Sequence, residues 1–112
     1  MLEGAFTREL IKRLRSHAAL RDAYIVKHAN PFTAGVPDFS VSIGRTTLWC
    51  EVKRHHQNPT KLQWHTIKKL EDGSAVIWFN SDKLAFVYWN DITTDWMTMS
   101  ELCAWIARRM AR

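Results

Sequence analysis

The sequence lacks the features of a secreted or membrane-anchored protein. No apolar run reaches the roughly 18 residues of a membrane span, and the N-terminal stretch MLEGAFTREL carries acids where a signal peptide has basic residues before an apolar run. Cysteine is scarce: Cys50 and Cys103 fall in apolar contexts, and neither belongs to a CxxC pair. We expect a soluble, cytoplasmic protein with two buried free thiols and no cysteine-based zinc site.

Negative charge is the minority sign. The 112 residues include 16 Lys and Arg but 11 Asp and Glu, which gives a formal charge of +5. This excess favours a polyanionic partner such as nucleic acid. The chain has no repeat, no low-complexity segment and no linker, so residues 1–112 suit one domain with one site.

Hydrophobic spacing predicts the order helix, three strands, helix, two strands, helix. The expected elements are a helix over 2–18, strands over 23–28, 38–43 and 46–53, a helix capped by Thr60 and running to about Asp72 before Gly73, strands over 74–80 and 83–90, and a last helix with the stripe Met99, Leu102, Cys103, Ile106 and Met110. Gly44 and Arg45 turn the second strand into the third. The pattern predicts an α/β sandwich, with a central mixed sheet flanked by helices.

The stretch LWCEVKR, residues 48–54, places two charges inside an apolar strand. Strand side chains alternate, so Glu51 and Lys53 share one face. Burying such a pair costs several kcal/mol per ion, so a further interaction should compensate. Asp38, at the start of the neighbouring strand, and Glu3, in the middle of the apolar face of the first helix, are the acids that converge on Glu51. Glu3 has an alternative role at the positive end of the helix dipole.

Carboxylates that lie close together raise one another's pKa unless a cation shares them. Oxygen-only ligands suit Mg²⁺ or Mn²⁺, which also accept a phosphate oxygen from a substrate. Lys53, on the same strand face, would then stabilise charge that develops during an in-line displacement at phosphorus. The acids and the lysine therefore predict metal-dependent phosphodiester hydrolysis.

The segment AGVPDFSVSIGRTTLWCEVKR…NPTKLQ resembles the G-x-P-D, E-x-K and Q series of the VRR-NUC family of PD-(D/E)XK nucleases. The resemblance covers roughly residues 3–80 and implies a restriction-endonuclease-like fold. Standalone phage and bacterial members of this family are similar to Holliday junction resolvases, which act as homodimers and cut branched DNA with Mg²⁺ or Mn²⁺. The chain would then work in the cytoplasm, or in the host cytoplasm if a phage encodes it.

The resemblance also implies a role for individual residues. Asp38 and Glu51 match the metal carboxylates, the backbone carbonyl of Val52 a third ligand, and Lys53 the catalytic lysine. Gln63 matches the glutamine that positions substrate or water, and Glu3 matches the acid of the first helix, a further ligand through water. Thr7 departs from the pattern, because relatives often have Gln or Glu at this place.

Gln63 has a structural alternative. Thr60 and Gln63 fit a capping box, in which the glutamine bonds back to the N–H of the cap residue. Thr98 and Glu101 have the same form, and there we expect capping alone.

Basic residues around the E-x-K motif predict a DNA-contacting rim. Adjacent strand residues face opposite ways, so His55 and His56 are expected to contact phosphate rather than metal. The alternative is an ordinary solvated surface. The rim consists of Lys53, Arg54, His55, His56, Lys61, Lys68 and Lys69. The family resemblance adds Lys27 as a DNA contact, because similar phage sequences carry a lysine at the end of the first strand; its alternative is a solvated lysine at a strand end.

The strand KLAFVYWN, residues 83–90, is apolar on both faces, which predicts a cover such as a two-fold dimer. The sequence thus favours a homodimeric endodeoxyribonuclease that acts on branched DNA. Two alternatives are a sequence-selective, restriction-like nuclease and a DNA-binding module without catalysis.

Overall fold

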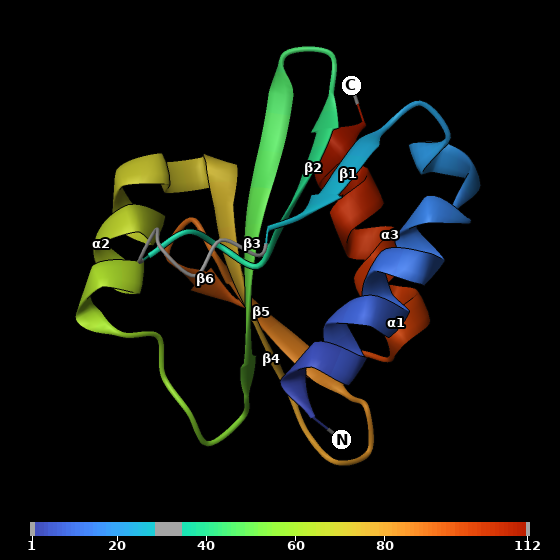
Figure 1. The fold of residues 1–112 in the computed structure, drawn as a ribbon. Helices are drawn as coiled ribbons and strands as arrows, with labels where there is room; N and C mark the ends of the chain where they lie inside the picture. The colour runs from blue at the N-terminus through green and yellow to red at the C-terminus, as the bar shows by residue number, and fades with distance from the viewer. Residues whose placement is uncertain (1, 29–34, 112) are drawn as a thin grey trace.

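The computed structural model describes residues 2–28 and 35–111, and it consists of a mixed sheet between helices (Figure 1). The strands lie in sequence order, and β3 and β4 are the parallel pair while their neighbours are antiparallel. The elements are α1 (Glu3–Arg15), η1 (Ala18–Leu20), β1 (Tyr24–Lys27), β2 (Phe39–Ile43), β3 (Thr46–Arg54), α2 (Lys61–Leu70), η2 (Glu71–Gly73), β4 (Ser74–Phe79), β5 (Ala85–Trp89), β6 (Ile92–Thr93) and α3 (Met99–Met110).

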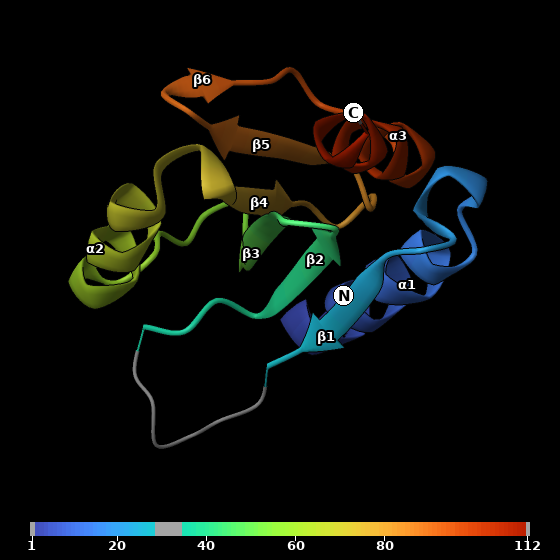
Figure 2. The same cartoon turned by 90° about the horizontal axis from the view of Figure 1, so that it is seen from above.

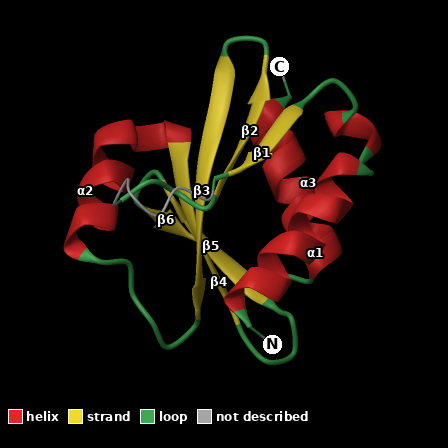
Figure 3. Ribbon diagram, viewed as in Figure 1, coloured by secondary structure: helices red, strands yellow, loops and turns green. Residues whose placement is uncertain are grey.

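The helices form two unequal layers. Helices α1 and α3 lie together on one face of the sheet and α2 lies alone on the other (Figures 2 and 3). The main core fills the space between the sheet and the helices α1 and α3, and its buried residues include Phe6, Leu10, Val52, Ile77 and Ile106. A smaller apolar cluster under α2 consists of Ile67, Val76 and Trp78, with Trp64, Phe86 and Tyr88 packed against it. The prediction of a mixed sheet flanked by helices is confirmed.

Two predicted helix ends are wrong by a few residues, and one short strand was not predicted. Helix α1 ends at Arg15 rather than residue 18, because the His17 side chain accepts the N–H of Ala19 and starts a separate 3₁₀ turn. Helix α2 ends at Leu70 rather than Asp72, because Glu71 adopts a positive φ of 52°. Strand β6 was not predicted, because it spans two exposed residues without an alternating pattern. Of the expected loop 29–37, residues 29–34 lie outside the described residues.

The tight hairpin between β2 and β3 fixes the register that the site depends on. Gly44 has a φ of +58°, so Ile43 and Thr46 pair directly across a two-residue turn. The ladder runs to the pair Phe39 and Cys50. Asp38 therefore comes beside Glu51, one step beyond the last pair.

Strand β5 is covered on both faces within one chain. Ala85 and Val87 are fully buried in the main core, and Phe86 packs on Trp78 in the smaller cluster. The apolar composition of this strand therefore has an explanation without a second copy. Both cysteines are buried and free, as predicted. Each helix of the described residues is too short or too polar to cross a bilayer.

We expect Phe6→Ala to lower the free energy of unfolding by about 3 to 5 kcal/mol, the usual cost of emptying a buried aromatic site. Phe6 is fully buried and stacks on Phe79 of β4 at 4.3 Å between ring centroids. Leu2→Ala, at a residue that is 68% exposed, is the control and should change the value by no more than about 0.5 kcal/mol. Urea denaturation measures both, and equal effects would contradict the packing of α1 described here.

Candidate active site

Two carboxylates meet where β2 begins and β3 ends. The Val52 N–H donates to Oδ2 of Asp38 at 2.7 Å, which fixes the Asp38 side chain against β3. The Glu51 side chain is 3% exposed and lies close enough to Asp38 for the two carboxylates to interact. The hairpin thus brings the two predicted metal ligands together.

Burial, and then the charge and hydrogen bond of Asp38, raise the pKa of Glu51 to about 8 from its ordinary value of 4.5, while Lys53 opposes the shift. Two adjacent carboxylates cannot both ionise at low energy in a buried place. Without a cation, Glu51 therefore keeps its proton near neutral pH. The pair is therefore suited to a positively charged ligand that can replace that proton.

The Val52 backbone adds an oxygen to the same place. In an antiparallel pair, the N–H and C=O of one residue point to the same neighbouring strand. Because the Val52 N–H reaches Asp38, its carbonyl also points to the β2 side, past the last ladder pair at Cys50. Two carboxylates and one peptide carbonyl form a donor set of oxygen atoms, which fits Mg²⁺ or Mn²⁺.

Lys53 lies on the same strand face as Glu51, as alternation predicts. Its Nζ is 4.0 Å from Oε1 of Glu51, and its side chain is 15% exposed. The distance exceeds that of a hydrogen bond. The ammonium group thus lies next to the acids and reaches solvent, where it can meet an anion.

Gln63 makes both of the contacts that the sequence left as alternatives. Its Oε1 accepts the Thr60 N–H at 2.8 Å, and its own N–H donates to the Thr60 hydroxyl at 3.1 Å, which completes a capping box. Its Nε2 donates to Oε1 of Glu51 at 3.2 Å. One side chain therefore starts α2 and also holds an acid of the site.

Glu3 lies at the first residue of α1, within the electrostatic reach of the site. Burial raises its pKa, Lys53 and Arg54 lower it, and Asp38 raises it. Across residues 2–28 and 35–111, no three His, Cys, Asp or Glu side chains form a group that could hold a metal ion. Glu3 therefore does not complete a three-acid cluster. The Thr7 hydroxyl donates to the backbone carbonyl of Glu3 and so is engaged within the helix.

The predicted DNA contacts are divided between the two faces of the sheet. Arg54 is the last residue of β3, His55 and His56 follow it, and Lys61, Lys68 and Lys69 are exposed on α2. Lys27 is paired with Phe39, whose side chain belongs to the main core, so Lys27 points to the α1 face and away from Glu51.

His28 is a polar residue near the acids that the sequence analysis did not identify. Its N–H donates to the Asp38 carbonyl at 2.8 Å, its Nε2 lies 2.9 Å from the Ser40 hydroxyl, and its ring stacks on Trp49. Alternation from Ile25 along YIVKH would have placed it on the Glu51 face. His28 thus supports the start of β2, where Asp38 lies.

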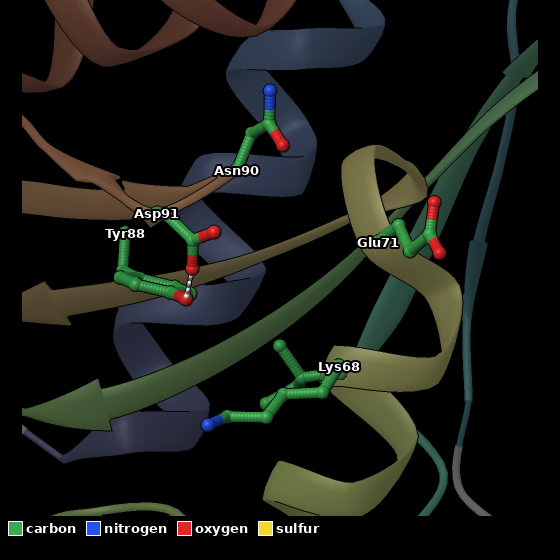
Figure 4. A pocket seen from close by; sticks show the side chains of 6 residues that line it. Lys68, Glu71, Tyr88, Asn90 and Asp91 are labelled. Atoms are coloured by element: carbon green, nitrogen blue, oxygen red, sulfur yellow. Dashed lines mark hydrogen bonds between the residues drawn. The ribbon is translucent and has the colours of Figure 1, made fainter.

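A separate pocket lies between α2 and the β5–β6 turn (Figure 4). Within it, the Tyr88 hydroxyl donates to Asp91 at 2.7 Å. The pocket is not lined by Asp38, Glu51, Lys53 or Gln63, so it is separate from the candidate active site. Its lining residues are Ile67, Lys68, Glu71, Tyr88, Asn90 and Asp91.

The double role of Gln63 predicts that its two functions can be separated. Gln63→Glu keeps an acceptor for the cap but replaces the donor to Glu51 with a third negative charge. We expect a thermal midpoint near that of the unchanged chain in EDTA, and cleavage of branched DNA reduced at least about tenfold. Thr60→Ala is the matched control: it should cost about 1 kcal/mol of stability with little loss of cleavage. The reverse pattern would make Gln63 a cap alone.

The raised pKa of Glu51 predicts an unusual pH dependence for the metal-free chain. Between pH 4.5 and about 8 the folded state holds a proton that the unfolded state has lost, so stability falls as pH rises, by at most about 1.4 kcal/mol per pH unit. Glu51→Gln cannot ionise and should remove this part of the slope. Urea denaturation in EDTA across this range measures the difference between the two chains. Parallel curves would show that Glu51 ionises normally.

Comparison with known proteins supports the fold. No family model and no curated protein sequence matches the chain. Among solved structures, the chain is similar to Hjc of Archaeoglobus fulgidus, a Holliday junction resolvase from an archaeal hyperthermophile. The TM-score is 0.60 at 15% identity, and the match covers 89% of this chain and 98% of Hjc. The VRR-NUC resemblance stays a prediction, and the chain has the restriction-endonuclease-like fold that the sequence predicted.

Proposed function

We propose that the chain is a metal-dependent endodeoxyribonuclease of the PD-(D/E)XK class, which hydrolyses phosphodiester bonds in branched DNA. The observation that carries the proposal is the buried Asp38–Glu51 pair with Lys53 on the same strand face. A fold shared with a Holliday junction resolvase supports the same reading. A surface that only bound DNA would gain nothing from buried acids beside its basic residues.

In this proposal, Asp38, Glu51 and the Val52 carbonyl would hold Mg²⁺ or Mn²⁺, with Glu3 as a further ligand through water. A bound cation would supply activation of water and neutralisation of phosphate charge. Lys53 donates to a phosphate oxygen and stabilises the charge that develops as water adds to phosphorus and the P–O bond to the leaving strand breaks. Gln63 keeps the Glu51 carboxylate in position through its 3.2 Å hydrogen bond.

Binding of DNA is assigned to the basic residues at the end of β3 and on α2. Arg54, His55 and His56 extend from the end of β3, and Lys61 and Lys68 project from α2. Contacts to phosphate are independent of sequence and weaken steeply with salt. Lys27 would contact a strand only from the α1 side of the sheet.

We expect Asp38→Asn and Lys53→Ala each to reduce cleavage at least about a hundredfold while DNA binding in EDTA is kept. The assay uses labelled four-way junction, flap, single-stranded and linear duplex DNA with Mg²⁺, Mn²⁺ or EDTA. Lys83→Ala, an exposed lysine in the turn before β5, is the control and should cut as the unchanged chain does. Undiminished cutting by the purified site variants would overturn the assignment. Equal cutting of linear duplex would favour a restriction-like enzyme.

We also propose that the active form is a homodimer, which would present two sites to the two strands of a branched duplex. The support is the family resemblance, since the chain itself covers both faces of β5. Light scattering at micromolar concentration and moderate salt should give twice the mass of one chain. A monomer under these conditions would count against the dimer without affecting the assignment of the acids.

A further inference from the structure

A row of aromatic rings crosses the sheet from the proposed catalytic lysine to the surface. Lys53 pairs with Trp78 on β4, and Trp78 pairs with Phe86 on β5, so the three side chains share one face. Trp78 and Phe86 stack at 5.1 Å with their planes 14° apart. The bridge between Ala85 and Met97 brings the next ring, Trp96, beside Phe86, and the two rings meet edge to face at 4.8 Å.

Trp96 ends this row and is 46% exposed, whereas Trp78 is 8% exposed. The rings behind it are held firmly, because the Trp78 indole N–H donates to the Gln57 carbonyl at 2.7 Å. The His55 ring approaches Trp96 at 6.5 Å between centroids and contacts His56 in turn. A solvent-facing indole that packs on Phe86, with a histidine beside it, therefore adjoins the basic rim.

The position of Trp96 relative to the acids limits what it can meet. Trp96 lies about three strand spacings from Lys53 across the sheet, or about 14 Å. A DNA strand rises about 3.4 Å per base step, so a strand that runs from a phosphate at Lys53 toward Trp96 reaches it within about four steps. Bases inside a duplex already stack on their neighbours, whereas an unpaired base has a free face.

We infer that Trp96, with His55 beside it, stacks on an unpaired base of the DNA strand held at Asp38, Glu51 and Lys53. The inference rests on the proposed function and adds the means of substrate selection. The phosphate contacts of the rim bind any duplex equally, and the aromatic contact adds affinity only where pairing is interrupted, as at a flap or a junction. The positive charge of Lys53 at the start of this row, together with the net charge of +5, favours a nucleic acid over a second copy of this basic chain.

The test is the affinity of the full chain for two DNAs, measured by fluorescence anisotropy in EDTA so that no cutting occurs. One DNA is a linear duplex, and the other is the same duplex with a short single-stranded flap. Trp96→Ala should raise the Kd for the flap DNA about 5- to 100-fold, the usual effect of losing one base–aromatic stack, and change the Kd for the duplex less than about twofold. Trp96→Phe should keep most of the preference.

Three controls keep the result interpretable. Trp96→Leu retains an apolar contact with Phe86 but cannot stack on a base, so it should lose the affinity for the flap DNA selectively, and it provides this test if the alanine variant unfolds. Tyr24→Ala removes an aromatic that is 73% exposed on the opposite edge strand and should leave both Kd values unchanged. A 2-aminopurine placed at the branch should lose fluorescence on binding the unchanged chain, and much less on binding Trp96→Leu.

Several outcomes would overturn the inference. For Trp96→Leu, they are an equal loss of affinity for both DNAs or no loss for either. An effect of Tyr24→Ala as large as that of Trp96→Leu would also count against it. So would a lower mass of Trp96→Leu than of the unchanged chain in light scattering, because that would place Trp96 between two copies. Failure of the proposed function has a different signature, because then the unchanged chain binds neither DNA or Asp38→Asn cuts normally.

Discussion

The hydrogen bond from the Val52 N–H to Asp38 is the contact on which the rest of the site depends. It joins Asp38, just before β2, to Val52, near the end of β3. The pairing of the two strands is thereby extended by one step, with the Asp38 side chain as the acceptor in place of a backbone carbonyl. The consequence is that Asp38 and Glu51 lie next to each other in a buried place. Neighbouring carboxylates in such surroundings have a high free energy, which the fold bears because the surrounding core is well packed.

The sequence predicted the parts of the site that follow from local periodicity. Strict alternation in β2 and β3 gave the face of Glu51 and Lys53, and the two-residue turn at Gly44 gave the register that places Asp38. The capping signature gave the start of α2 at Thr60. These features depend on neighbours only a few residues away, so one sequence contains enough information to predict them.

Other features depend on contacts between distant segments and could not be predicted locally. Helix α2 ends early because Glu71 takes a positive φ, and the Ser74 hydroxyl then donates to the Ile67 carbonyl at the end of the helix. The aromatic row requires the bridge between Ala85 and Met97, which no periodic pattern announces. The double contact of Gln63 likewise requires α2 to lie over β3, which is a property of tertiary packing.

The capping boxes at Thr60 and Thr98 have the same local geometry but different surroundings. This difference determines which substitutions each box tolerates during evolution. At Glu101 a carboxylate completes the cap in solvent, so glutamate and glutamine can replace each other there with little effect on fitness. At Gln63 the amide also faces Glu51, so only an uncharged donor fits. Homologues of this chain should therefore have either glutamate or glutamine at position 101 but keep glutamine at position 63.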